Sequence, residues 1–339
     1  NLGRNAKKLG GKFLVICSDN SRRRFGDQVE ASLAEQEKEV VFTTFHGEAT
    51  KDEVFAKMDA CKDNGCDVVV GMGGGKALDT AKAVAENLGL PCVILPTVAS
   101  NDAPCSGVAV LYNDAGEVIK AVLMRRNPDL VLVDTAIIAD APRRLFAAGL
   151  GDALSTWFEA RACKQSGART MARGNVSNTG MMMARLCYDL LMEKGRDAMA
   201  AVERHEVTPA LEDVVEAAIY LSGLAAAHAV NDGFAQEPQA HGMYHGEKVA
   251  FGTLTQLVLE GAPQEELEQV LSFLKDTGLP LTLAQLGVKE IVPDTLMKVA
   301  EAAVVPTQST KNLRADITAQ EVYDAILEAD RLGRAYLAR

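Results

Sequence analysis

Short apolar runs and stretches of helical spacing alternate along roughly the first 135 residues of the chain. The runs have strand length and are rich in valine, isoleucine and aromatic residues, at 13–17, 40–45, 67–71 and 91–96. Between them, apolar residues recur every three or four positions, as in 50–63 and 76–88. Because strands that alternate with helices form βαβ units, this pattern predicts an α/β fold with a mainly parallel sheet.

Three further strand-like runs follow, at 108–112, 118–124 and 130–133. The first two flank an Asn-Asp-Ala-Gly stretch at 113–116, and these residue types favour a tight turn between antiparallel strands. The sequence therefore predicts a hairpin in addition to the parallel sheet.

After Pro142 the strand-like runs end, and alanine, leucine, methionine, glutamate and arginine dominate. Helical spacing predicts helices at 143–164, 171–195, 197–205, 209–229, 247–260, 264–277, 293–303 and 319–337. The change of pattern predicts two domains: an N-terminal α/β domain over 1–142 and an all-α domain over 143–339.

The composition narrows the class of protein. Of the 339 residues, 48% are hydrophobic and 24% are charged, which is typical of a globular protein. The net charge of −11 argues against nucleic-acid binding, which depends on basic surfaces, and no apolar run approaches the roughly 20 residues that span a bilayer. Among the seven cysteines only Cys61 and Cys66 are close in sequence, so we expect reduced thiols of a cytoplasmic protein rather than a zinc knuckle.

A glycine-rich loop, Gly71 to Gly75 followed by Lys76, joins the third predicted strand to a helix. Glycines at such a place let a phosphate approach backbone amides at the positive end of the helix. The loop departs from a P-loop at Val70 and Ala77, and Lys76 stands where a Rossmann fingerprint has glycine. A tight turn without a ligand is the alternative interpretation.

A second candidate loop follows the strand at 91–96, and it is rich in hydroxyl groups and prolines. In a parallel sheet it emerges at the same carboxyl edge as the glycine loop, where ligands bind. Thr97, Ser100 and Ser106 could donate to phosphate or ribose oxygens, and Asp102 could accept hydrogen bonds from a polyol. Helix capping and turn formation explain the same residues equally well.

The helical half carries Asp152 and a concentration of histidines that includes His228 and His245. One aspartate and two histidines can form a catalytic metal site that leaves positions open for water or substrate. These residues lie far apart in the sequence, and a histidine on an apolar helix is commonly a hydrogen-bonded core residue, so spacing alone leaves both interpretations open.

Four segments resemble the iron-containing alcohol dehydrogenase superfamily, and within it the glycerol dehydrogenase group: 73–82, 96–106, 149–153 and 244–252. The similarity runs along nearly the whole chain. It implies an N-terminal NAD-binding domain, a helical C-terminal domain, and oxidation of glycerol to dihydroxyacetone by metal-assisted hydride transfer. It implies zinc ahead of iron, in agreement with the affinity order of divalent metals.

The resemblance also assigns residues. It implies Asp152, His228 and His245 as zinc ligands and Asp102 as a contact of the substrate hydroxyls. On the cofactor side it implies Ser18, Gly74, Gly75, Lys76, Asp79, Thr97, Ser100, Ser106, Val108 and Tyr112. The family has an acidic residue after the first strand to hold the adenosine ribose, whereas this chain has Ser18 with Asp19 next to it.

As partners, the resemblance implies a small polyol and a homo-oligomer, with an octamer as the expected size, and neither nucleic acid nor membrane. It also predicts that a short glycine-containing segment is missing between Gly223 and Leu224 and that the N-terminus is trimmed. The alternatives are a related 1,2-diol dehydrogenase, a dehydroquinate-synthase-like lyase, a sugar-phosphate dehydrogenase and a non-catalytic binding protein. The lyase and the sugar-phosphate enzyme bind anionic substrates, yet 225–246 contains neither lysine nor arginine.

Overall fold

The computed structural model describes residues 1–339 except 114–115, 117, 171–173 and 222–225, and the side chain of Ala226 is also outside the description. The described residues form two compact units. The first comprises Asn1–Ala99 and Ala103–Ile138, and the second comprises Ser100–Asp102 and Ala139–Arg339.

A five-stranded, fully parallel sheet organises the first unit, with strand order β2-β1-β3-β4-β7. Its strands are β1 (Lys12–Cys17), β2 (Glu39–Thr44), β3 (Val68–Gly73), β4 (Cys92–Pro96) and β7 (Leu130–Val131). Every residue of β3 is buried. Helices that cover both faces of a parallel sheet explain why these strands are continuous apolar runs rather than alternating ones. The prediction of a mainly parallel sheet is confirmed.

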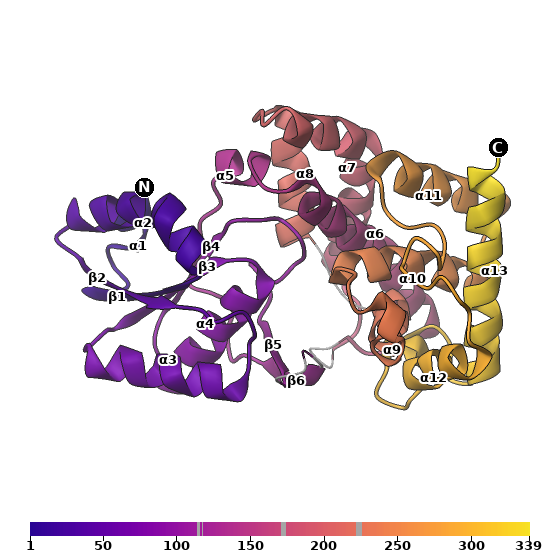
Figure 1. Cartoon of the computed structure of the whole chain (residues 1–339), viewed down its shortest axis with the longest axis horizontal. Helices are drawn as coiled ribbons and strands as arrows, with labels where there is room; N and C mark the ends of the chain where they lie inside the picture. Colours follow the sequence, from indigo (N-terminus) through magenta and orange to yellow (C-terminus); the bar gives the residue numbers. More distant parts are fainter. Residues whose placement is uncertain (114–115, 117, 171–173, 222–225) are drawn as a thin grey trace. The chain divides into compact units, whose positions relative to one another are not determined.

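Helices cover both faces of this sheet: α1 (Leu2–Ala6) and α2 (Asp19–Ala34) on one, α3 (Lys51–Asp63) and α4 (Gly75–Leu88) on the other (Figure 1). Because side chains alternate along a strand, β1 contributes to two cores. Phe13 and Val15 belong to the core with α1 and α2, and Leu14 and Ile16 belong to the core with α3 and α4.

The predicted hairpin is present as β5 (Val108–Tyr112) and β6 (Val118–Leu123), which pair antiparallel in a sheet of their own. Two of its expected turn residues, Asp114 and Ala115, lie outside the described residues. The backbone amide of Tyr112 donates to the carbonyl oxygen of Ala49 at 2.9 Å, so the end of β5 is joined to the loop that precedes α3.

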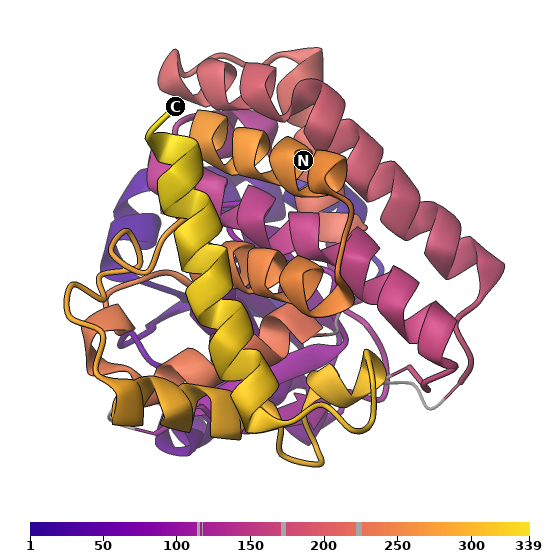
Figure 2. The same cartoon turned by 90° about the vertical axis from the view of Figure 1, so that its right-hand side faces the viewer.

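Helices are the regular secondary structure of the second unit among its described residues. After α5 (Thr135–Ala139) it contains α6 (Arg143–Ser166), α7 (Asn178–Glu203), α8 (Pro209–Tyr220), α9 (Ala226–Gly233), α10 (His245–Glu260), α11 (Gln264–Thr277), α12 (Pro293–Ala303) and α13 (Ala319–Leu337). Helix α10 is central, because it packs against α6, α9, α11 and α13. Figure 2 shows α13 crossing in front of α10, and α12 lies beside the lower end of α13.

Two separate helices were predicted, at 171–195 and 197–205, and the break between them is wrong. A single helix, α7, runs from Asn178 to Glu203. Its start is set by Ser177, whose hydroxyl accepts a hydrogen bond from the amide of Gly180 at 2.9 Å. Such an N-cap stabilises a helix start by about 1 kcal/mol. Residues 171–173, where the first of these helices was expected to begin, are outside the described part of the chain.

The single helix predicted over 209–229 is also wrong, because α8 ends at Tyr220 and α9 begins at Ala226. Leu221 is the C-cap of α8, and residues 222–225 are outside the described part of the chain. Gly223 and Leu224, between which a missing segment is expected, lie outside the described residues, so that expectation stays a prediction.

None of the helices in the described ranges combines the length and the apolar character that a membrane crossing requires.

Candidate metal centre and dinucleotide edge

Asp152, His228 and His245 meet in the helical unit although they come from three different helices, α6, α9 and α10. The Oδ1 atom of Asp152 lies 3.2 Å from Nε2 of His228 and 3.2 Å from Nε2 of His245. One ligand atom from each residue lies within 4.8 Å of the others, so together they could hold a metal ion. The structure therefore brings together the three residues that the sequence left dispersed.

Glycines next to two of these residues allow their helices to approach closely. A Cβ atom on Gly246 would lie 1.8 Å from the carbonyl oxygen of Ala148, and one on Gly151 would lie 2.4 Å from that of Gly246. Helices α6 and α10 therefore touch through their backbones at the point where Asp152 and His245 stand. Gly252 has the same role toward α9, because its Cβ would lie 2.5 Å from the carbonyl oxygen of Ala227, the neighbour of His228.

The first turn of α10, where His245 is the first residue, is fixed by a carboxylate. Glu247 accepts a hydrogen bond from the backbone amide of Tyr244, the N-cap residue, at 2.7 Å. The same carboxylate receives two hydrogen bonds from the guanidinium of Arg144 in α6, at 2.6 and 2.8 Å. This bidentate pair orients the end of the helix that presents His245.

A buried glutamate that the sequence analysis missed holds the ring of His228. Glu159 is fully buried and accepts from the backbone amide of His228 at 3.1 Å and from its Nδ1 at 3.0 Å. Because Nδ1–H is then the donor, Nε2 is left as the nitrogen that faces Asp152. The available signal was spacing: Glu159 follows Asp152 by two helical turns and so lies on the same face of α6.

The charges of this cluster favour a cation. Burial alone would raise the pKa of the Asp152 carboxyl, but His245 and His228 outweigh burial and hold that pKa well below its ordinary value. Burial alone would lower the pKa of His228, but Glu159 and Asp152 raise it well above the ordinary value. Two carboxylates around these imidazoles therefore stabilise positive charge, and the Asp152 carboxyl stays ionised, as a metal ligand must be.

Asp102 lies beside this centre. Its backbone amide donates to Oδ2 of Asp152 at 3.3 Å, and the short segment Ser100–Asp102 clusters with the helical unit although the residues around it belong to the first unit. The second oxygen of the Asp152 carboxylate is thus occupied by the loop that carries Asp102, while the first faces the two histidines.

Several of the expected cofactor residues follow adjacent strands at the carboxyl edge of the sheet. Ser18 follows β1, Gly74 and Lys76 follow β3, and Thr97 follows β4, where its amide donates to the carbonyl oxygen of Gly73 at 3.0 Å. The strand order reverses direction between β1 and β3, and such a switch point is where open α/β sheets bind their ligands. Gly74 is the N-cap of α4 and Gly75 its first residue, so helix amides face this edge.

At the end of β1, the neighbouring residues Ser18 and Asp19 have different roles. The Ser18 hydroxyl accepts from the amide of Ser21 at 3.1 Å and so caps α2. Asp19 accepts from the hydroxyl of Thr44, at the end of β2, at 2.9 Å. The acidic side chain at this edge of the sheet is therefore that of Asp19, one position after Ser18, which the resemblance indicated.

Asp79 is buried in α4 rather than open to a ligand. Its Oδ1 lies 2.8 Å from Nζ of Lys82, and its Oδ2 accepts from the amide of Val110 in β5 at 3.2 Å. Lys82 is also buried, and its ammonium donates to the carbonyl oxygens of Ala103 at 2.9 Å, Ser106 at 3.3 Å, and Val108. The Asp79–Lys82 pair thus holds the segment that contains Ser106 and Val108.

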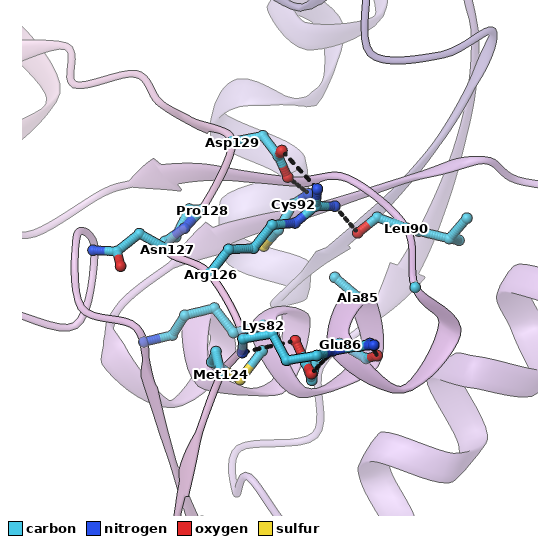
Figure 3. Close-up of a pocket in the computed structure, with 12 residues that line it drawn as sticks. Lys82, Ala85, Glu86, Leu90, Cys92, Met124, Arg126, Asn127, Pro128 and Asp129 are labelled. Carbon is cyan, nitrogen blue, oxygen red and sulfur yellow. Dashed lines mark hydrogen bonds and ion pairs between the residues drawn. The ribbon is translucent and has the colours of Figure 1, made fainter. Parts of the chain in front are cut away.

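A separate pocket of about 300 Å³ lies at the opposite edge of the sheet (Figure 3). It is lined by the start of β4 at Cys92 and by the loop before β7, including Arg126 and Asp129. Arg126 pairs with Asp129 at 3.5 Å and donates to the carbonyl oxygen of Leu90 at 3.4 Å. The pocket lies at the amino ends of the strands, whereas the glycine loop lies at their carboxyl ends.

The cysteines are free thiols, and burial makes two of them unreactive. No disulfide joins the seven cysteines, all of which are among the described residues. Burial raises the pKa of the Cys92 and Cys187 thiols to about 12, so both stay protonated.

Comparisons with known proteins give results that are consistent with one another. A sequence profile of iron-containing alcohol dehydrogenases matches residues 1–135. A glycerol dehydrogenase of Escherichia coli O6:H1 is 48% identical over 99% of this chain and 94% of its own length. A glycolaldehyde reductase of Halobacterium salinarum is 41% identical over 98% of this chain and 93% of its own. The crystal structure of glycerol dehydrogenase from Schizosaccharomyces pombe superposes with a TM-score of 0.95 at 34% identity, covering 99% of this chain and 87% of that one.

Proposed function

Because this chain belongs to the iron-containing alcohol dehydrogenase family, we propose that it oxidises glycerol at C2 to dihydroxyacetone, with NAD as the hydride acceptor. The observation that carries the proposal is the meeting of Asp152, His228 and His245 at one point of a chain that is 48% identical to a glycerol dehydrogenase. Residues 1–142 would bind NAD, and residues 143–339 would hold the metal.

The donor set fits a zinc ion. One carboxylate oxygen and two imidazole nitrogens are ligands that zinc accepts, and three protein ligands leave a position open for substrate. Iron accepts the same donors, but the affinity order of divalent metals favours zinc. When bound, the metal would supply Lewis-acid chemistry, lowering the pKa of a substrate hydroxyl.

The residues of the chain would prepare this reaction by holding its components. Glu159 keeps Nε2 of His228 facing Asp152, and Glu247 fixes the helix end that presents His245. Gly74, Gly75 and Lys76 would receive the pyrophosphate at the start of α4, while Thr97, Ser100, Ser106, Val108 and Tyr112 would line the nicotinamide side. Asp79 would act through Lys82, which holds the carbonyl groups of Ser106 and Val108 in place. When bound there, NAD would supply the hydride-accepting chemistry of the reaction.

The substrate assignment can be tested directly by initial rates. We expect NAD-dependent oxidation of glycerol and 1,2-propanediol, much slower oxidation of ethanol, none of glycerol phosphate, and a preference for NAD over NADP because Asp19 would repel a 2′-phosphate. A chelator should remove the activity, and zinc should restore it.

Comparable rates with ethanol would contradict a polyol enzyme, and turnover of glycerol phosphate would favour the anionic-substrate alternatives. Fastest reduction of glycolaldehyde would instead favour the activity named for the Halobacterium relative.

Asp102 would orient a second hydroxyl of the polyol, which predicts a substrate-selective effect of Asp102→Asn. Asparagine keeps one acceptor oxygen but loses the charge that strengthens a hydrogen bond to a hydroxyl. We expect kcat/KM for glycerol to fall roughly five- to thirtyfold, or about 1–2 kcal/mol in transition-state binding. The matched substrate is 2-propanol, which lacks the second hydroxyl and should be affected much less. Equal losses for both alcohols would mean that Asp102 supports only the loop.

The assembly and the compartment are part of the proposal. We expect a homo-oligomer, with an octamer as the expected size, and a cytoplasmic enzyme. The buried and unpaired thiols of Cys17, Cys61 and Cys92 are compatible with a reducing compartment.

A further inference from the structure

The lysine of the glycine loop is engaged by a carboxylate from a neighbouring loop. Oε1 of Glu48, which follows β2, accepts a hydrogen bond from Nζ of Lys76, and the two side chains form an ion pair. The same ammonium lies 4.8 Å from the centroid of the Tyr112 ring. Lys76 therefore has an anionic partner at the edge of the sheet where the cofactor phosphates would bind.

The position of Glu48 is set by contacts on both sides of it. His46 donates from its backbone amide to Glu53 at 3.1 Å, and its Nδ1 lies 2.9 Å from the same carboxylate. On the other side, the carbonyl oxygen of Ala49 accepts from the amide of Tyr112 at 2.9 Å. The loop is thus hydrogen-bonded to α3 before Glu48 and to β5 after it.

Lys76 is the ion-pair partner of the Glu48 carboxylate. Its other oxygen, Oε2, is shielded from solvent and has no hydrogen-bond partner among the described residues. A shielded carboxylate oxygen without a partner is unfavourable, so the ion pair with the ammonium contributes to stabilising the charge of Glu48, whose side chain is 35% exposed. If a pyrophosphate draws Lys76 away, Glu48 loses its ion-pair partner. If the pyrophosphate shares Lys76 instead, its negative charge lies beside that of Glu48.

We propose that Glu48 is a counter-ion that competes with the cofactor pyrophosphate for Lys76 and so weakens dinucleotide binding. This inference rests on the proposed function, since it takes the glycine loop as the pyrophosphate site. Glu48 thereby keeps the affinity for NADH below the value that Lys76 and the start of α4 would otherwise give. A lower affinity favours release of the reduced cofactor after hydride transfer.

The test is the affinity for NADH, measured by its fluorescence, and for ADP, measured by calorimetry. Glu48→Gln should tighten both roughly five- to tenfold, the size expected for removing one partly screened like charge a few ångströms from a phosphate. In a Lys76→Met background the same change should have little effect, because the contested cation is gone. Adenosine has no phosphate, so its affinity should be the same in all variants.

Glu39→Gln is the matched control. Glu39 lies at the opposite end of β2 and pairs with Lys12 at 3.0 Å, so this variant also removes one carboxylate from a glutamate–lysine pair. It should leave the NADH affinity unchanged. Unchanged or weaker NADH binding in Glu48→Gln would overturn the inference, and equal tightening in the Lys76→Met background would replace competition by general charge repulsion. If the wild-type protein bound neither NADH nor ADP, the proposed function itself would fail.

Discussion

His245→Ala is expected to abolish glycerol oxidation while the fold survives. His245 contributes one of three converging ligand atoms, and its removal leaves a pair of ligands on Asp152 and His228. Because a Lewis-acid metal supplies several kcal/mol of transition-state stabilisation, kcat/KM should fall on the order of a thousandfold or more. The His245 side chain is 42% exposed, so its loss opens no large cavity, and circular dichroism and thermal unfolding should be nearly unchanged.

Metal content measured on the same samples separates the role of His245 from a general effect. Zinc bound per chain should drop in His245→Ala and stay at the wild-type value in His241→Ala, the matched control. His241 lies four residues earlier, is exposed, and points its Nε2 at the carbonyl oxygen of Ala235 at 3.0 Å. Wild-type activity with stoichiometric zinc in His245→Ala would remove this residue from the site.

Lys82→Met is expected to have the largest effect on stability. The Lys82 ammonium is buried against Asp79 and against the carbonyl oxygens of Ala103, Ser106 and Val108. Methionine fills a similar volume but leaves a buried carboxylate without its cation. Breaking a buried pair in this way costs about 3–5 kcal/mol, so we expect a comparable loss in the free energy of unfolding of the first unit. Chemical denaturation, followed by a probe in that unit, measures it.

Two further variants test whether the buried charge is the cause. Lys62→Met removes an exposed lysine that lies 4.0 Å from Asp59, and its effect should be below about 1 kcal/mol. Adding Asp79→Asn to Lys82→Met removes the stranded charge and should recover part of the lost stability. If Lys82→Met unfolded like Lys62→Met, the pair would not support the segment that carries Ser106 and Val108.

Local patterns predicted most of the secondary structure because strands and helices differ in how often an apolar residue recurs. The run at 13–17 became β1, and the spacing over 264–277 and 293–303 matched α11 and α12. The errors lie where local signals are weak. Nothing in the spacing required α7 to continue past residue 195, and its start depends on a single cap at Ser177.

The chemistry of the candidate centre was visible in the residue types, but its assembly was not. Asp152 and His228 are 76 positions apart, and only the contacts of α6, α9 and α10 bring them within 3.2 Å. The resemblance indicated these residues without a physical reason for their meeting. The structure supplies one, because backbone contacts at Gly151 and Gly246 let α6 and α10 approach closely.

The type of each element and the kinds of chemistry available follow from the sequence, because both depend on neighbouring residues and on the nature of the side chains. Which side chains contact one another depends instead on packing. The packing places Glu159 against His228, Asp79 against Lys82, and Glu48 against Lys76. Each of these pairs joins charges or hydrogen-bonding groups that the sequence shows only as separate polar residues. Their energies arise from distance and from exclusion of water, and folding alone determines both quantities.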